Sequence, residues 1–227
     1  MEDSKNQPFS YSRDAVFSNF MQRVYQWMAM GLTLTGLAAF VTVGNTSLLR
    51  FVMHSMWLFI IAEFALVIWL SASIQKISAQ AAIVGFLAYS VLNGVTMSGI
   101  FLAYTAASIS STFFITAITF AGVSAYGWVT KQDLTSVGSL CGMALWGVIV
   151  ASVVNMFFHS PAFYYVSSYF GVAIFIGLTA YDTQRLKAIH QSMENAPEQL
   201  AIIGALILYL DFINMFFFLL RLFGRRR

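Results

Sequence analysis

The chain has 227 residues, of which 59% are hydrophobic and only 9% are charged, and its mean hydropathy is +0.76. Soluble domains carry about 25% charged residues, so this composition excludes an ordinary soluble protein and indicates an integral membrane protein. The single cysteine excludes an internal disulfide, and the net charge of +3 comes largely from arginines at the C-terminus. No basic stripe interleaved with aromatic residues is present, so we expect no nucleic-acid partner.

Residues 1–20 form a polar segment with charges of both signs. This segment lacks a compact apolar run followed by a small-residue cleavage site, so we do not expect a signal peptide. We expect residues 21–224 to form a single transmembrane domain and residues 225–227 to form a basic tail.

A membrane-spanning helix needs about 20 predominantly apolar residues. Seven segments meet this requirement, at about residues 22–43, 48–71, 79–104, 107–129, 136–158, 164–186 and 200–223. The sequence therefore predicts an all-α, polytopic membrane protein with seven transmembrane helices. In an alternative with six spans, the last segment is re-entrant and the basic tail lies inside.

The distribution of Lys and Arg indicates the orientation of the chain. With seven spans, every interior loop on the N-terminal side carries a base, including Lys76, Lys131 and Arg185. Two of the three loops on the other side carry none. We therefore expect a cytoplasmic N-terminus and treat the basic tail as an exception to the rule.

Three acidic residues, Glu63, Asp182 and Asp211, lie inside or at the edge of the apolar segments. An unpaired charge at the centre of a bilayer costs at least ~2.5–3.5 kcal/mol. No Lys or Arg lies deep enough in the same segments to pair with them obviously. Three acids without an internal base suggest a site that holds a proton or a cation.

Asp182 and Asp211 lie on consecutive antiparallel segments joined by a short polar loop, so we expect them to be neighbours. Two carboxylates within hydrogen-bonding distance cannot both ionise easily, and they titrate as a unit. Their oxygens, when deprotonated, suit a hard cation such as calcium. Glu63 could reach the same cytoplasmic vestibule, and Asn214 shares a helix face with Asp211.

A structural alternative remains open for these acids. Each could cap or staple a helix, with Thr183 and Arg185 satisfying Asp182.

Catalytic motifs are largely missing. The chain has no HExxH motif and no Walker A sequence. Tyr181-Asp182 matches the first motif of intramembrane aspartyl proteases, but Asp211 does not follow the Gly-x-Gly of the second, and the Pro-Ala-Leu signature is missing. That enzyme is the least favoured interpretation. We expect no catalytic residues and no resident cofactor.

Two segments, residues 177–184 (GLTAYDTQ) and 208–214 (LYLDFIN), resemble the signature segments of the Bax inhibitor-1 family, also called transmembrane Bax inhibitor motif proteins. Residues 24–32 (VYQWMAMGL) and 92–94 (LNG) are similar to its first and third helices. The resemblance covers nearly the whole chain after residue 20. The short N-terminus and compact loops are similar to those of a bacterial member, which implies the inner (plasma) membrane.

The resemblance implies a seven-helix fold with the C-terminal helix central. It also implies a pH-sensitive calcium leak channel whose sensor and gate are Asp182 and Asp211, the residues that would bind calcium transiently. Glu63 and Asn214 would line the ion pathway with them. The family uses a basic residue near the end of helix two as a latch, and the candidates here are Lys76 and Arg185.

The partners implied by the resemblance are the lipid bilayer, calcium ions and protons. Bacterial relatives also include a protein that restrains a membrane-anchored protease. The alternative function is therefore a non-transporting regulator that binds such a protease or another membrane protein.

Overall fold

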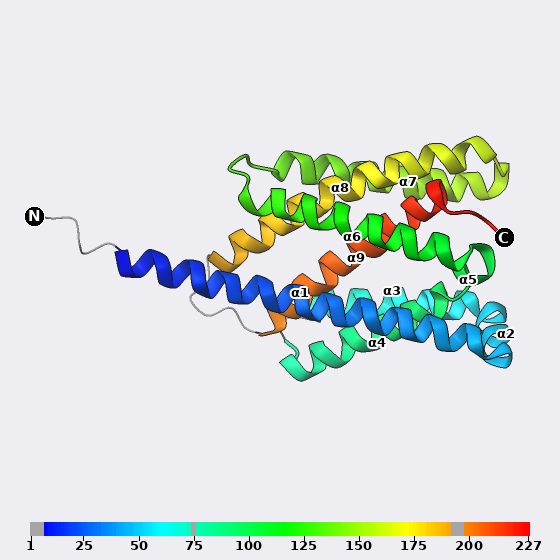
Figure 1. Ribbon diagram of the computed structural model, residues 1–227, viewed down its shortest axis with the longest axis horizontal. Helices are drawn as coiled ribbons and strands as arrows, with labels where there is room; N and C mark the ends of the chain where they lie inside the picture. The colour runs from blue at the N-terminus through cyan, green and yellow to red at the C-terminus, as the bar shows by residue number, and fades with distance from the viewer. Residues whose placement is uncertain (1–6, 74–75, 192–197) are drawn as a thin grey trace, which may run out of the picture. The chain divides into compact units, whose positions relative to one another are not determined.

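The computed structural model describes residues 7–73, 76–191 and 198–227 (Figure 1). Apart from an isolated pairing of Tyr104 with Arg226, the described residues form α-helices and short connections. In chain order the helices are α1 (Gln7–Gly44), α2 (Thr46–His54), α3 (Met56–Ser73), α4 (Ala79–Met97), α5 (Ile100–Ala103), α6 (Ala106–Val129), α7 (Thr135–Phe158), α8 (Pro161–Gln191) and α9 (Glu198–Phe223).

Seven stretches of the described chain are helical, long and apolar enough to cross a membrane. They are Asn19–Gly44, Met56–Ser73, Ala79–Ala103, Ala106–Val129, Thr135–Phe158, Pro161–Ile189 and Glu198–Phe223. The predicted all-α class with seven spans is therefore confirmed. In α9 67% of the most apolar window is buried, against 39% or less in every other span.

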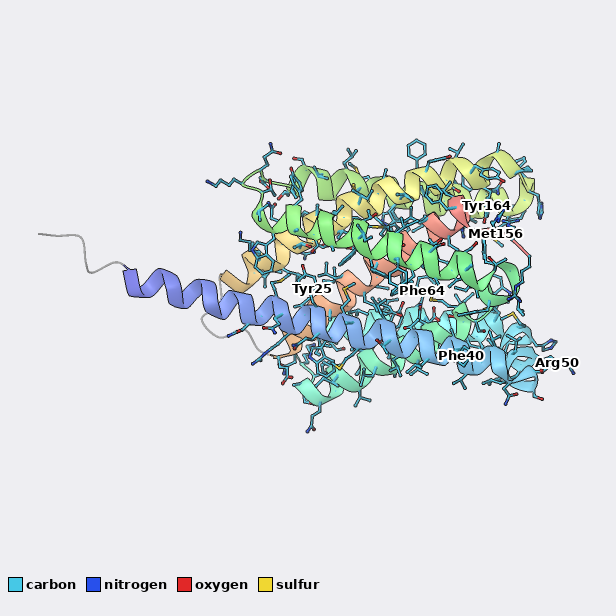
Figure 2. The ribbon with its side chains drawn as sticks, viewed as in Figure 1. Tyr25, Phe40, Arg50, Phe64, Met156 and Tyr164 are labelled. Carbon is cyan, nitrogen blue, oxygen red and sulfur yellow. The ribbon has the colours of Figure 1, made fainter. Side chains whose placement is uncertain are left out.

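The other spans expose large apolar side chains that water would not tolerate as a continuous surface. Figure 2 shows Phe40 on α1 and Phe64 on α3, which are 70% and 66% exposed. On α7 Trp146 and Phe157 are similarly exposed. Lipid tails would cover these side chains, and the helices satisfy their own backbone groups, as a spanning segment must.

The predicted second span, residues 48–71, begins too early. The structure divides this stretch at Ser55 into the short helix α2 and the span α3. The side chain of Asn45 caps α2 by accepting hydrogen bonds from the N–H groups of Ser47 and Leu48, at 3.1 and 3.0 Å. The sequence between residues 48 and 71 contains no Gly or Pro. A prediction from hydropathy alone therefore joined the two helices into one span.

The described chain divides into two compact units. The first comprises Met1–Gly99 and Leu186–Leu206, and in it α4 packs against α1 and α3. The hydroxyl of Thr35 on α1 donates to the carbonyl of Ser90 on α4 at 2.9 Å. A Cβ atom added at Gly94 would lie 2.3 Å from the carbonyl oxygen of Thr35, so these two helices touch through their backbones.

The second unit comprises Ile100–Arg185 and Ile207–Arg227, and it contains both aspartates of interest. Phe175 of α8 packs with Met215 and Leu219 of α9 in a buried cluster. The ring of Phe212 on α9 lies edge-on to Phe113 and Phe120 of α6, with centroids 5.4 and 5.6 Å apart. Apolar packing from α6 and α8 therefore holds this half of α9.

Glycines bring α6 and α7 close to α8 next to Asp182. A Cβ atom added at Gly127 of α6 would lie 2.3 Å from the carbonyl oxygen of Ala180. One added at Gly138 of α7 would lie 2.4 Å from the ring of Tyr181. The two residues before Asp182 are thus in close contact with α6 and α7, which have no room for a side chain at Gly127 and Gly138.

The loop between α6 and α7 is tied to α8 at the same level. Gln184 accepts a hydrogen bond from the N–H of Leu134 at 2.9 Å and donates one to the carbonyl of Gln132 at 2.7 Å. Asp133 accepts from the N–H and hydroxyl of Thr135, at 2.9 and 2.6 Å, at the start of α7. These bonds fix the polar end of the second unit nearest Asp182.

The C-terminal tail lies at the opposite end of α6, beside α5 (Figure 1). Thr105 N–H donates to the carbonyl of Arg225 at 3.1 Å, and Arg227 N–H donates to the carbonyl of Ala103 at 3.0 Å. The 24 residues of α6 separate this end from Gln132, a distance of about 36 Å at 1.5 Å per residue. That length exceeds the ~30 Å hydrocarbon core. The structure therefore supports seven spans over the six-span alternative.

We predict that Gln132 and Arg227 lie on opposite sides of the membrane. Single cysteines at these positions, in a Cys141→Ala background, can be tested with an impermeant thiol reagent on intact cells. With the cytoplasmic N-terminus expected from the loop charges, only the cysteine at 227 reacts before lysis and both react afterwards. Labelling of both or of neither in intact cells contradicts seven spans.

We predict that Gly127→Ala destabilises the protein by about 1–3 kcal/mol, because its methyl group meets backbone that cannot move aside. The thermal unfolding midpoint in detergent measures the effect. Gly122→Ala is the matched control, since it lies on the same helix and an added Cβ meets no atom within 4 Å. Equal shifts in the two variants would show that the α6–α8 contact is not tight.

Candidate ion and proton site

The structure brings the carboxyl groups of Asp182 and Asp211 together within the second unit. Asp182 lies on α8, Asp211 lies on α9, and their carboxyl groups lie within reach of each other. Ionised carboxylates are acceptors only, so a hydrogen bond between these two groups requires one of them to carry a proton. The pair is therefore placed so that its two carboxyl groups could share one proton.

Asp211 is the buried member of the pair, with only 5% of its surface exposed. Its Oδ2 atom is buried and has no hydrogen-bond partner. Leaving a buried polar atom unsatisfied costs about 1–3 kcal/mol. A proton or a cation that bound to this oxygen would therefore supply the partner that the protein does not provide.

Asp182 is half-buried and feels the positive charge of Arg185, which is exposed one helical turn later on α8. Thr183 does not satisfy it: the Thr183 hydroxyl donates to the carbonyl of Thr179 at 2.8 Å and bonds with Ser124 of α6 at 2.9 Å. Of the two stapling partners considered from the sequence, only Arg185 acts on Asp182 in the structure.

Asn214 lies one turn after Asp211 on α9 and is half-buried. Its side-chain nitrogen donates to the carbonyl of Leu210 at 2.8 Å, a bond within its own helix. A cation would use the other end of this side chain, the carbonyl oxygen. The assignment of Asn214 to an ion pathway thus stays a prediction.

Glu63 belongs to the first unit, where it is half-buried on α3 and accepts a hydrogen bond from the hydroxyl of Thr96 on α4. Tyr89 lies close enough for electrostatic interaction with it, and Asn93 donates to the Tyr89 hydroxyl at 3.4 Å. Glu63 therefore has polar neighbours from α4 inside the span. Its convergence with the aspartate pair stays a prediction.

Sequence reasoning missed this cluster around Glu63. The available signal was the spacing of Tyr89, Asn93 and Thr96, which recur at three and four residues on one face of an apolar helix. Lys76, the other latch candidate, is exposed in the connection before α4. It belongs to the first unit, and its role likewise stays a prediction.

The two carboxyl groups of the pair would fill only part of the ligand shell of a cation. Among the described residues, no group of three or more His, Cys, Asp or Glu side chains is placed to hold a metal ion. Calcium takes six to eight oxygen ligands, so two carboxylates supply only part of its shell. Asn214, backbone carbonyls and water would have to provide the remainder.

Comparison with known proteins identifies the chain. The family described as "Inhibitor of apoptosis-promoting Bax1" matches residues 17–227. The chain is 44% identical over 220 residues to the inner membrane protein YbhL of Escherichia coli, covering 94% of each protein. It is 36% identical over 228 residues to protein RP147 of Rickettsia prowazekii, covering 99% of this chain and 95% of the relative. It is 34% identical over 216 residues to protein YrjE of Lactococcus lactis, covering 90% of each. This chain is a multi-pass membrane protein that belongs to the Bax inhibitor-1 family.

Proposed function

We propose that this protein is a pH-sensitive calcium leak channel of a bacterial inner membrane, gated by Asp182 and Asp211. One observation supports the proposal most directly. The two carboxyl groups lie within reach of each other in an apolar setting, and Oδ2 of Asp211 is buried without a partner. Such an arrangement is sensitive to the loss of one proton and to the arrival of one cation.

The closed state is the one with the shared proton. The proton allows a hydrogen bond between α8 and α9 and leaves the pair with one negative charge, which Arg185 partly offsets. Because the bond joins two different spans, it holds them together at the level of the pair. In this state the pair offers a cation less charge than two carboxylates would.

The open state follows when the pH rises and the proton leaves. Two adjacent negative charges in a medium of low dielectric constant repel each other strongly. The repulsion favours separation of α8 from α9, and an incoming calcium ion neutralises the charge. Proton loss therefore opens the path and creates the attraction for the ion in a single step.

Glu63, Asn214 and the latch bases have supporting parts in this proposal. Glu63, held by Thr96, would supply a further carboxylate along the path, and Asn214 would supply a neutral oxygen. Arg185 would stabilise the closed pair through its charge on Asp182. Lys76 would be the second base available at the cytoplasmic side.

We predict that Asp211→Ala weakens calcium binding more than Asn214→Ala does. A carboxylate contributes a full charge and up to two ligand oxygens, whereas an amide contributes a single dipole. Calcium titration of the purified protein above pH 7, followed by calorimetry, measures both affinities. Equal losses would mean that α9 contributes packing here and not a cation site.

We predict that calcium flux into proteoliposomes rises between pH 5 and pH 8, with a midpoint between about 5 and 7.5. Asp182→Asn and Asp211→Asn each remove one of the two groups that share the proton, so each should flatten the pH profile. Flux measured with a calcium-sensitive dye at several pH values gives the midpoint and slope.

Asp133→Asn is the matched control for these variants. The bonds from Thr135 hold the pKa of the Asp133 carboxyl below its usual value, so this exposed group stays ionised across the tested range. The control should keep the wild-type profile. If the pair variants also keep it, the pair is not the sensor. Absence of any flux, together with co-purification of a membrane-anchored protease, would instead favour a regulator that does not transport ions.

A further inference from the structure

The end of the second unit that carries the C-terminal tail is strongly basic. Four arginines lie there, and residues 100–108, 155–166 and 221–227 contain no Asp or Glu. The tail is held in place, because its backbone pairs with Tyr104 and the N–H of Arg225 donates to the hydroxyl of Ser108 at 3.0 Å. The arginines are Arg221, Arg225, Arg226 and Arg227. Their charge is therefore presented at a defined place and not on a free tail.

Arg226 is the best fixed of the four. Its guanidinium lies 5.0 Å from the centre of the Tyr164 ring on α8, near the hydroxyls of Tyr104 and Tyr164. These hydroxyls are 3.1 Å from each other. A guanidinium has five donor hydrogens in a planar fork. The exposed side chain can therefore keep its tyrosine contacts and still donate to an anion.

A pocket of about 560 Å³ opens beside Arg226, where α7 ends and α8 begins. Figure 2 shows Met156 and Tyr164, which line it. Asn155, His159 and Ser160 add polar groups to the wall. The Oδ1 atom of Asn155 accepts a hydrogen bond from the N–H of Ser160 at 2.9 Å. The Nδ2 atom of Asn155 therefore remains to act as a donor. The pocket consequently contains several donor groups beside Arg226 that can bind an oxyanion.

A second, mostly apolar pocket of about 740 Å³ shares Asn155 and Ser160 with the first. Its wall is a stripe along α7, from Trp146 through Val150 and Val154 to Phe158, with Phe163 of α8. The 12 residue steps from 146 to 158 span about 18 Å at 1.5 Å per residue. One leaflet of the hydrocarbon core is about 15 Å thick. The apolar groove therefore has the length of a lipid tail and begins at the donor pocket.

We propose that this paired surface binds one anionic phospholipid of the leaflet that meets the tail. The phosphate lies in the donor pocket beside Arg226, and one acyl chain lies along the α7 stripe. The surplus of positive charge selects an anionic headgroup over a zwitterionic one, and the groove selects a lipid over free phosphate. A lipid held only by nonspecific contact with the apolar surface would need the groove but not Arg226.

The proposal is tested with the purified full-length protein in detergent, by native mass spectrometry with dioleoyl phosphatidylglycerol and, separately, dioleoyl phosphatidylcholine. We expect wild type to retain phosphatidylglycerol preferentially. Arg226→Gln should reduce that preference about fivefold, since one arginine near an anionic surface contributes about 1 kcal/mol. Arg225→Gln is the matched control, because it removes the same charge from the tail but its side chain does not line the pocket.

The groove is tested with a second pair of variants. Gly147 lines the groove and an added Cβ meets no atom within 4 Å, so the side chain of Gly147→Phe can enter the groove. This variant should retain less phosphatidylglycerol. Gly142→Phe, equally open but outside the groove, should retain the wild-type amount. Equal effects of the two phenylalanines would overturn the assignment of the acyl chain to the groove.

Two further outcomes would overturn the proposal. Equal losses in Arg226→Gln and Arg225→Gln would show a diffuse charge effect, and displacement of the lipid by the same concentration of inorganic phosphate would show a phosphate site. If Arg226→Gln does not fold, photoactivatable phosphatidylglycerol is crosslinked to wild type and mapped by mass spectrometry. Crosslinks concentrated in residues 146–165, and absent with the matching phosphatidylcholine, support the site, whereas identical maps for both lipids refute it.

Discussion

The cost of placing two carboxyl groups in an apolar interior governs the second unit of this protein. Asp182 and Asp211 lie within reach of each other there, and a hydrogen bond between them requires one of them to keep a proton. The surrounding contacts make the bond sensitive to geometry. Gly127 brings α6 against the backbone of Ala180, and Phe212 packs α9 against α6. The pair is therefore positioned by rigid neighbours and is not free to relax into solvent.

The same helix that carries Asp211 also carries the tail. Backbone bonds to Ala103 and Thr105 fix the C-terminal end of α9 beside α5, ten and more residues beyond the aspartate. If repulsion separates the pair, the C-terminal end of α9 is less able to move than α8. The movement is then expected in α8, or in the part of α9 before Asp211. A bound lipid at Arg226 would reinforce the fixed end, and would further confine any gating movement of the proposed channel.

The sequence predicted the fold class well because a spanning helix can be recognised from the hydropathy of its own residues. The pairing of Asp182 with Asp211 also followed from local features, since a short loop joins their two helices. The break at Ser55 was missed because no Gly or Pro marks it and both flanking helices are apolar. The bond of Glu63 with Thr96 and the contact of Gly127 with Ala180 join residues far apart in the chain. Such contacts depend on helix packing, which a single sequence does not specify.

For the proposed leak, an incomplete ligand set would be an advantage. Conduction requires a site that attracts the ion and still releases it, so tight chelation would block the path. In the described part of the chain the carboxylate pair gains no third His, Cys, Asp or Glu that would complete a metal centre. A calcium ion at the pair would therefore keep several water ligands and exchange readily. In the proposed channel a shared proton would serve the same purpose, because the proton and the cation would compete for the same oxygens. Proton binding at Asp182 and Asp211 would then favour release of the cation.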